Sequence, residues 1–255
     1  DISKELLYYN LIINSLYKSI ILRRYFMKKR PNILLITSDQ QHFNTIGAFN
    51  KEIFTPNLDR LVKEGTTFDR AYCPNPTCTP TRASIITGKY PSQHGAWTLG
   101  TKLSETENTI GNVLRENGYK SALIGKAHFQ PLASTEEFPS LEAYPYLQDL
   151  EFWKNYKEKF YGFDHVELAR NHTNESHVGQ HYAIWLEEKG CKNWRDYYLS
   201  PTGNMSEEEY PRLEILVEKE GNILNSRRNW GKWEIPEEYH YNSWIAERCN
   251  SMLEE

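Results

Sequence analysis

The sequence predicts an α/β fold, a three-layer α/β/α sandwich built around a mostly parallel central sheet. Short apolar runs alternate with segments that carry helix start and stop signals, which is the order that a parallel sheet with crossover helices requires. Polar residues follow the ends of two apolar runs, at the edge where such sheets bind ligands. The 255 residues, 39% of them hydrophobic, are enough for one domain with a sizeable core.

Three segments are predicted as strands. Asn32 to Ser38 is short, apolar and partly β-branched, as expected of a buried parallel strand, and it ends at Asp39. Thr66 to Tyr72 and Lys120 to Ile124 are predicted as the second and third strands. Because the carboxyl ends of parallel strands meet at one edge of a sheet, we expect Asp39 and Lys126 to meet in one cleft.

Four helices are predicted from capping signals. In the first, Thr55 is the N-cap, Pro56 occupies the first helical position and Gly65 ends the helix. The others are Thr81 to Thr87 before Gly88, Asn112 to Asn117 before Gly118, and Tyr239 to Glu254 with Trp244, Ile245 and Met252 on its apolar face.

Residues 1–26 are interpreted as an extension outside the fold. A lysine interrupts their apolar stretch and no small-residue cleavage site follows, so they do not read as a signal peptide, and Met27 looks like a natural start. An amphipathic anchor is the alternative. Residues 27–255 are predicted to form the domain, with 134–235 as a variable excursion of short helices.

Composition limits the partners and the compartment. The net charge is −4, and seven basic residues against two acids in the first 30 positions leave an acidic remainder, so we expect no nucleic acid partner. No apolar run is long enough for a membrane span. Cys73, Cys78, Cys191 and Cys249 form neither a CxxC pair nor a disulfide scaffold, which favours a reducing compartment and a bacterial cytoplasmic rather than periplasmic protein.

The strongest local signal is the heptad from Cys78 to Ser84. It places a cysteine at a loop-to-helix junction, with Arg82 one helical turn further along. Backbone N–H groups and the positive end of a helix favour an anion there, and Arg82 adds a fixed cation. From the residues alone, a buried cysteine near a structural arginine is an equally good interpretation.

A second signal runs from Gly118 and Tyr119 through a strand to Lys126 and His128. The strand and the glycine that follows it put both side chains on the same side of the backbone. A cation in this position neutralises charge on a transferred group and attracts an anion. A Lys-x-His pair on its own is typical of a solvated surface, so its weight comes from its position after Cys78.

A third signal is Asp39-Gln40 at the end of the first predicted strand. Hard oxygen donors at a strand end suit Ca²⁺, Mg²⁺ or Mn²⁺, although a lone Asp-Gln pair is more often a turn. His94 is interpreted as structural rather than catalytic. The remaining candidates, read as surface or lid residues because their spacing fits no zinc pattern, are His165, His172, His177 and His181.

Together these motifs resemble the type I sulfatase family of the alkaline-phosphatase-like superfamily. The heptad from Cys78 matches the signature Cys-x-Pro-x-Arg, and the segment ending at His128 resembles the second signature. The specific resemblance covers about residues 31–131. Many members have Asp-Asp where this chain has Asp39-Gln40, and in this respect it resembles choline-sulfatase-like enzymes and phosphonate monoester hydrolases.

The resemblance implies a mechanism. A maturation enzyme would oxidise Cys78 to formylglycine, whose hydrate attacks sulfur with one hydroxyl and expels sulfate through the other. Arg82 would support the diol and the metal shell, Lys126 would bind the sulfate group, and His128 would contact the diol.

The resemblance also implies a divalent cation at Asp39, Gln40 and the residue derived from Cys78. Ca²⁺ is the first expectation, with Mg²⁺ and Mn²⁺ as alternatives. Gln40 keeps an oxygen donor but removes one negative charge, which leaves the metal preference and a phosphoester substrate open.

Three possible functions follow from this resemblance. The first is hydrolysis of a small sulfate ester of a carbohydrate, choline or aryl alcohol. The second is hydrolysis of a phosphonate monoester or phosphodiester with the same nucleophile, and the third is a noncatalytic relative in which Cys78 is never matured. The motifs with which the family completes its metal site do not follow Pro131. We therefore expect residues 27–255 to be the amino-terminal part of a sulfatase catalytic domain, with 134–235 shaping the substrate pocket, and to be inactive and poorly stable alone.

Overall fold

The computed structural model describes residues 30–131, 133–137, 139–170, 178–198 and 235–254. The chain divides into two compact units, Asp1–Thr66 and Thr67–Glu255, and each is described by itself. The extension predicted for residues 1–26 lies outside the described residues. None of the described helices is long and apolar enough to cross a membrane.

The first unit contains a short 3₁₀ helix, η1 (Phe43–Thr45), and the helix α2 (Pro56–Glu64). As the capping signals predict, α2 has Thr55 as its N-cap and Gly65 as its C-cap. The Thr55 hydroxyl accepts the Gly47 N–H at 2.7 Å and donates to Asp59 at 2.9 Å, and the same carboxylate accepts the Ala48 N–H at 2.8 Å. These bonds hold the start of α2 against the loop that precedes it.

Two of the three predicted strands are wrong. Asn32 to Ser38 has no strand pairing, and its apolar residues Ile33 to Ile36 are 57–77% exposed. Thr66 to Tyr72 also forms no strand, and Phe68 is 78% exposed. An apolar run becomes a strand only when another strand supplies its hydrogen bonds, and the described residues offer neither segment such a neighbour.

The second unit has a parallel sheet of two strands, which confirms the α/β prediction. The strand β1 (Ala122–Gly125) begins two residues later than predicted and pairs with β2 (His165–Leu168), with Ala122 opposite His165 and Gly125 opposite Leu168. β2 has no counterpart among the predicted strands, and it lies in the segment expected to form short helices.

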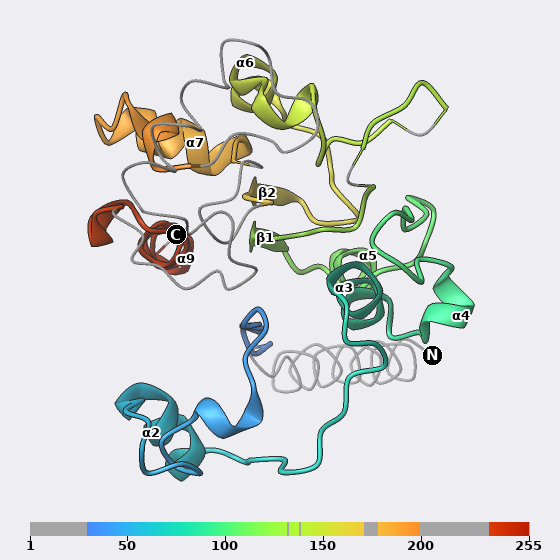
Figure 1. Cartoon of the computed structure of the whole chain (residues 1–255). Coiled ribbons are helices and arrows are strands. Elements are labelled where there is room, and N and C mark those ends of the chain that lie inside the picture. The colour runs from blue at the N-terminus through green and yellow to red at the C-terminus, as the bar shows by residue number, and fades with distance from the viewer. Residues whose placement is uncertain (1–29, 132, 138, 171–177, 199–234, 255) are drawn as a thin grey trace, which may run out of the picture. The chain divides into compact units, whose positions relative to one another are not determined.

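Helices of the second unit lie around these strands. They are α3 (Cys78–Thr87), α4 (Pro91–His94), α5 (Ile110–Glu116), α6 (Leu150–Asn155), α7 (Gln180–Glu188) and α9 (Tyr241–Glu254), with the 3₁₀ helices η2 (Tyr146–Gln148), η3 (Trp194–Tyr197) and η4 (Glu237–Tyr239). Figure 1 shows the strands between α7 and α9 on the left and α3 and α5 on the right. The predicted helices correspond to α3, α5 and α9, with starts that differ by two or three residues.

Two apolar clusters form the core of this unit. One joins α3 to the residues that follow β1, including Ala83, Ile86 and Phe129. The other joins α7 to α9 through aromatic side chains, including Tyr182 and Trp244. Because Phe129 is buried in the first cluster, the segment that carries Lys126 and His128 is anchored in the core at its far end.

Candidate active site

The loop before α3 fixes where that helix begins. The Asn75 side chain accepts both the backbone N–H of Thr77, at 2.8 Å, and its hydroxyl, at 2.5 Å, while the Thr81 hydroxyl donates to the Asn75 carbonyl. Cys78 is consequently the first residue of α3 and is partly exposed, whereas Thr79, next to it, is buried. A reactive group at position 78 would therefore be fixed in place and still accessible.

The structure brings Cys78, Arg82 and Lys126 together. The Lys126 ammonium donates to the Cys78 sulfur, with 3.6 Å between Nζ and Sγ. The Arg82 guanidinium donates to the Lys126 carbonyl, with 2.6 Å between Nη1 and O. These pairs are 48 and 44 positions apart in the sequence. The start of α3 and the segment after β1 thus form one site, in which a cation lies against the sulfur.

His128 follows in the same segment. Its side chain is buried, at 6% exposed, and its backbone φ of 57° lies in the left-handed region. Its backbone N–H donates to the carboxylate of Glu142 at 2.5 Å. The role of His128 toward the group at position 78 stays a prediction.

Glu142 is not among the site residues predicted from the sequence. Its carboxylate also accepts the N–H groups of Phe129, at 2.7 Å, and Gln130, at 2.9 Å. Burial raises the pKa of Glu142, while the three backbone N–H groups and Arg170 favour its charged form. No motif surrounds this glutamate in the sequence, so only its position in the fold reveals it.

His94 has the structural role that the sequence predicts. Its Nδ1 accepts the N–H of Ala96 at 3.1 Å, so in the neutral imidazole Nε2 carries the hydrogen and donates to the Ser84 hydroxyl at 3.0 Å. Burial lowers the pKa of His94, which favours this neutral form. The ring therefore fastens α4 to α3 and has no lone pair directed at Ser84.

The prediction that four histidines lie at a surface or in a lid has a different outcome for different residues. His172 and His177 lie outside the described residues. His165 starts β2 and lies 3.0 Å from the Glu167 carboxylate. The expectation is wrong for His181, because its Nδ1 accepts the Leu168 N–H at 3.1 Å and its ring packs edge-on against Trp153.

The described residues do not by themselves form a metal site. Asp39 is half-buried and Gln40 is exposed, and both belong to the first unit. Within the described parts of the chain, no group of three or more His, Cys, Asp or Glu side chains could hold a metal ion. Two adjacent side chains are too few for Ca²⁺, which takes six to eight oxygen ligands. The metal role of Asp39, Gln40 and Cys78 stays a prediction.

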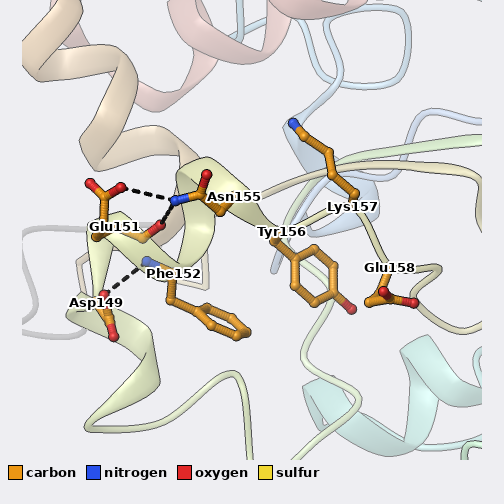
Figure 2. A pocket seen from close by; sticks show the side chains of 7 residues that line it. All are labelled: Asp149, Glu151, Phe152, Asn155, Tyr156, Lys157 and Glu158. Carbon is orange, nitrogen blue, oxygen red and sulfur yellow. Dashed lines mark hydrogen bonds between the residues drawn. The ribbon is translucent and has the colours of Figure 1, made fainter.

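An open pocket of about 420 Å³ lies beside α6 (Figure 2). Its lining residues are Asp149, Glu151, Phe152, Asn155, Tyr156, Lys157 and Glu158. Asp149 accepts the Phe152 N–H at 2.9 Å and Glu151 accepts from the Asn155 amide at 2.9 Å, so these polar groups stabilise α6 itself. None of the predicted site residues lines this pocket.

Comparison with known proteins agrees with the motifs. Residues 31–208 match the sulfatase family model. The chain is 33% identical over 169 residues to the uncharacterized sulfatase YidJ of Escherichia coli K12, an alignment that covers 60% of this chain and 33% of that protein. It is 28% identical over 176 residues to an N-acetylglucosamine-6-O-sulfatase of Bacteroides thetaiotaomicron, covering 65% of this chain and 32% of that protein.

The chain spans about a third of the length of these curated relatives. Among solved structures it is similar to the phosphonate monoester hydrolase of Agrobacterium radiobacter, with a TM-score of 0.59 and 23% identity, covering 89% of this chain and 38% of that one. This likeness shows a shared fold. With more than half of its residues matched by the family model, the chain belongs to the sulfatase family.

Proposed function

We propose that the full-length protein hydrolyses sulfate esters with a formylglycine nucleophile derived from Cys78. The observation that carries the proposal is the Lys126 ammonium 3.6 Å from the Cys78 sulfur at the first residue of α3. Membership of the sulfatase family supports the same chemistry at the level of the reaction class.

The side chains of this site have separate tasks. Lys126 binds the negatively charged sulfate group of the ester, and the amino-terminal end of α3 adds partial positive charge at the same place. Arg82 fixes the Lys126 backbone through its carbonyl. Formylglycine supplies two hydroxyl groups on one carbon, one to take the sulfate and one to release it.

A maturation enzyme and a divalent cation complete the proposal. Cys78 is partly exposed at the start of α3, so an oxidising maturation enzyme can reach it. Asp39 and Gln40 are proposed as cation ligands because they are adjacent oxygen donors, with Ca²⁺ the first expectation and Mg²⁺ or Mn²⁺ as alternatives. The substrate is proposed to be a small sulfated carbohydrate, choline or aryl ester.

The proposal is tested with the full-length protein produced together with a formylglycine-generating enzyme. Two esters of the same aryl alcohol, a sulfate and a phosphonate, are compared as substrates. We expect hydrolysis of the sulfate, and its loss in the Cys78→Ala variant. In Cys78→Ser, the serine lacks the second hydroxyl, so a sulfated peptide should accumulate. Equal sulfate hydrolysis by the wild type and Cys78→Ala would contradict the proposal.

A second candidate is hydrolysis of phosphonate monoesters with the same nucleophile. The fold likeness to a phosphonate monoester hydrolase and the loss of one negative charge at Gln40 favour it. Faster hydrolysis of the phosphonate than of the sulfate in the paired assay would select this function, and it would still require Cys78.

A further inference from the structure

We propose that Glu142 is a positioning residue for Lys126 and His128. Its buried carboxylate fixes the backbone segment from which both side chains extend. The inference rests on the proposed function, because it concerns the same anion-binding site.

Three consecutive backbone N–H groups converge on this carboxylate. Oε1 accepts from His128 at 2.5 Å, and Oε2 accepts from Phe129 at 2.7 Å and Gln130 at 2.9 Å. Successive N–H groups form such a concave anion site when left-handed and right-handed conformations adjoin. The φ of 57° at His128 supplies the left-handed residue. A backbone nest around an anion is thus formed here, with a side chain of the protein as the anion.

Glu142 is itself held firmly. It is 1% exposed, and its backbone carbonyl accepts from the Arg170 guanidinium at 2.7 Å. The buried Ser140 hydroxyl donates to the Pro131 carbonyl at 2.8 Å, on the far side of the same loop. The carboxylate is therefore held in place, so its hydrogen bonds can fix the position of residues 128–130.

Two further bonds of the segment show what Glu142 adds. Arg82 holds the Lys126 carbonyl, and the Leu103 N–H donates to the Phe129 carbonyl at 2.8 Å. These two bonds engage carbonyl oxygens only. The Glu142 carboxylate engages the N–H groups of the same segment, so it determines the rotation of the peptides on either side of His128.

A carboxylate is needed for this contact. Both of its oxygens accept hydrogen bonds, whereas the amide of glutamine would turn an NH₂ donor toward one or two backbone N–H donors. The alternative interpretation is that Glu142 only stabilises the fold. Glu167 is a matched control for that interpretation, because it is also a buried glutamate of the second unit, at 6% exposed, and bonds Arg248 at 2.6 and 2.7 Å.

The first measurement is hydrogen exchange at single amides of the full-length protein by NMR. The amides of residues 128–130 should be protected in the wild type. In Glu142→Gln they should exchange about tenfold faster, the change expected for the loss of one ordinary hydrogen bond, after correction for global stability. Glu167→Gln should leave these three rates within about twofold.

The second measurement is the affinity for inorganic sulfate, followed by the NMR signals of residues 126–128. Glu142→Gln should weaken binding about tenfold, again the equivalent of one hydrogen bond, and Glu167→Gln should not. In the Lys126→Ala background, Glu142→Gln should have a smaller effect than in the wild type, because only the contribution of His128 is left to lose. A residue that only stabilises the fold would not show this dependence on Lys126.

The outcomes separate this inference from the proposed function. A wild-type chain that binds no sulfate counts against the proposed function, while hydrogen exchange at residues 128–130 still decides the role of Glu142. Rapid exchange of these amides in the wild type, or equal rates in the wild type and Glu142→Gln, would overturn the inference. Glu142→Asp keeps the charge and shortens the reach by one methylene, so it replaces Glu142→Gln if that variant does not fold, with the same results expected.

Discussion

At the scale of single residues, the proposed function assigns the binding of sulfate to Lys126. Its ammonium lies 3.6 Å from the Cys78 sulfur, and Arg82 holds its carbonyl. Lys126→Ala should weaken inorganic sulfate binding by about 10- to 100-fold, because a hydrogen bond to a charged group contributes about 1.5–3 kcal/mol. Lys126→Arg should retain part of the affinity.

Isothermal titration with sulfate measures this change. The matched control is Lys189→Ala, since Lys189 pairs with Glu247 on the surface and contacts no predicted site residue in the described structure. Equal sulfate affinity in Lys126→Ala and the wild type would contradict the assigned role.

The half-buried imidazole of His181 makes stability depend on pH. Burial lowers the pKa of His181 to about 4, from an ordinary value of 6.5. The unfolded chain therefore takes up this proton at a higher pH than the folded chain does. The free energy of unfolding should fall as the pH drops from about 6.5 to about 4, by an amount on the order of 3 kcal/mol, and this contribution should not change further below pH 4.

Urea denaturation at several pH values tests this prediction. Asparagine at position 181 offers an oxygen acceptor for the Leu168 N–H but cannot take up the proton. His181→Asn should be less stable at pH 7, because it loses the ring contact with Trp153, and its stability should depend less on pH between 6.5 and 4. The same pH dependence in both proteins would contradict the assignment.

At the scale of elements, the close approach of α5 to the turn before β2 requires a glycine. A Cβ at Gly111 would lie 2.8 Å from the Gly162 carbonyl carbon and 2.9 Å from the Phe163 nitrogen. Because both are backbone atoms, α5 would have to move. Gly111→Ala should lower the free energy of unfolding by about 1–3 kcal/mol. Gly100→Ala, where a Cβ meets no atom within 4 Å, should leave it nearly unchanged in the same urea titration.

Four of the described helices, α2, α3, α5 and α9, could be predicted from the sequence, and strands mostly could not. The signals that start α2 and end α3, such as Pro56 and Gly88, act within one or two turns of the same helix, so the sequence contains them. A strand depends on a partner that is distant in the sequence. Ala122 pairs with His165, and no local pattern in the four residues of β2 indicates this pairing.

At the scale of the whole molecule, some residues of the site belong to local sequence motifs, whereas others are placed by contacts between distant parts of the chain. Cys78, Arg82 and Lys126 belong to two motifs that the sequence shows, and the structure brings them together. Glu142 could not be predicted, since its role comes from a loop that returns to the segment after β1. Asp39 and Gln40 belong to the first unit, and their role as metal ligands remains a prediction.

The most direct test of the central claim is the mass of one tryptic peptide. Trypsin cleaves after Arg70 and Arg82 and releases residues 71–82, which contain Cys78 and, as an internal comparison, Cys73. After production with a formylglycine-generating enzyme, this peptide should have lost one sulfur and two hydrogen atoms and gained one oxygen, with the change at position 78 only. An unaltered thiol at position 78, under conditions that convert a known sulfatase in the same cells, would contradict the account.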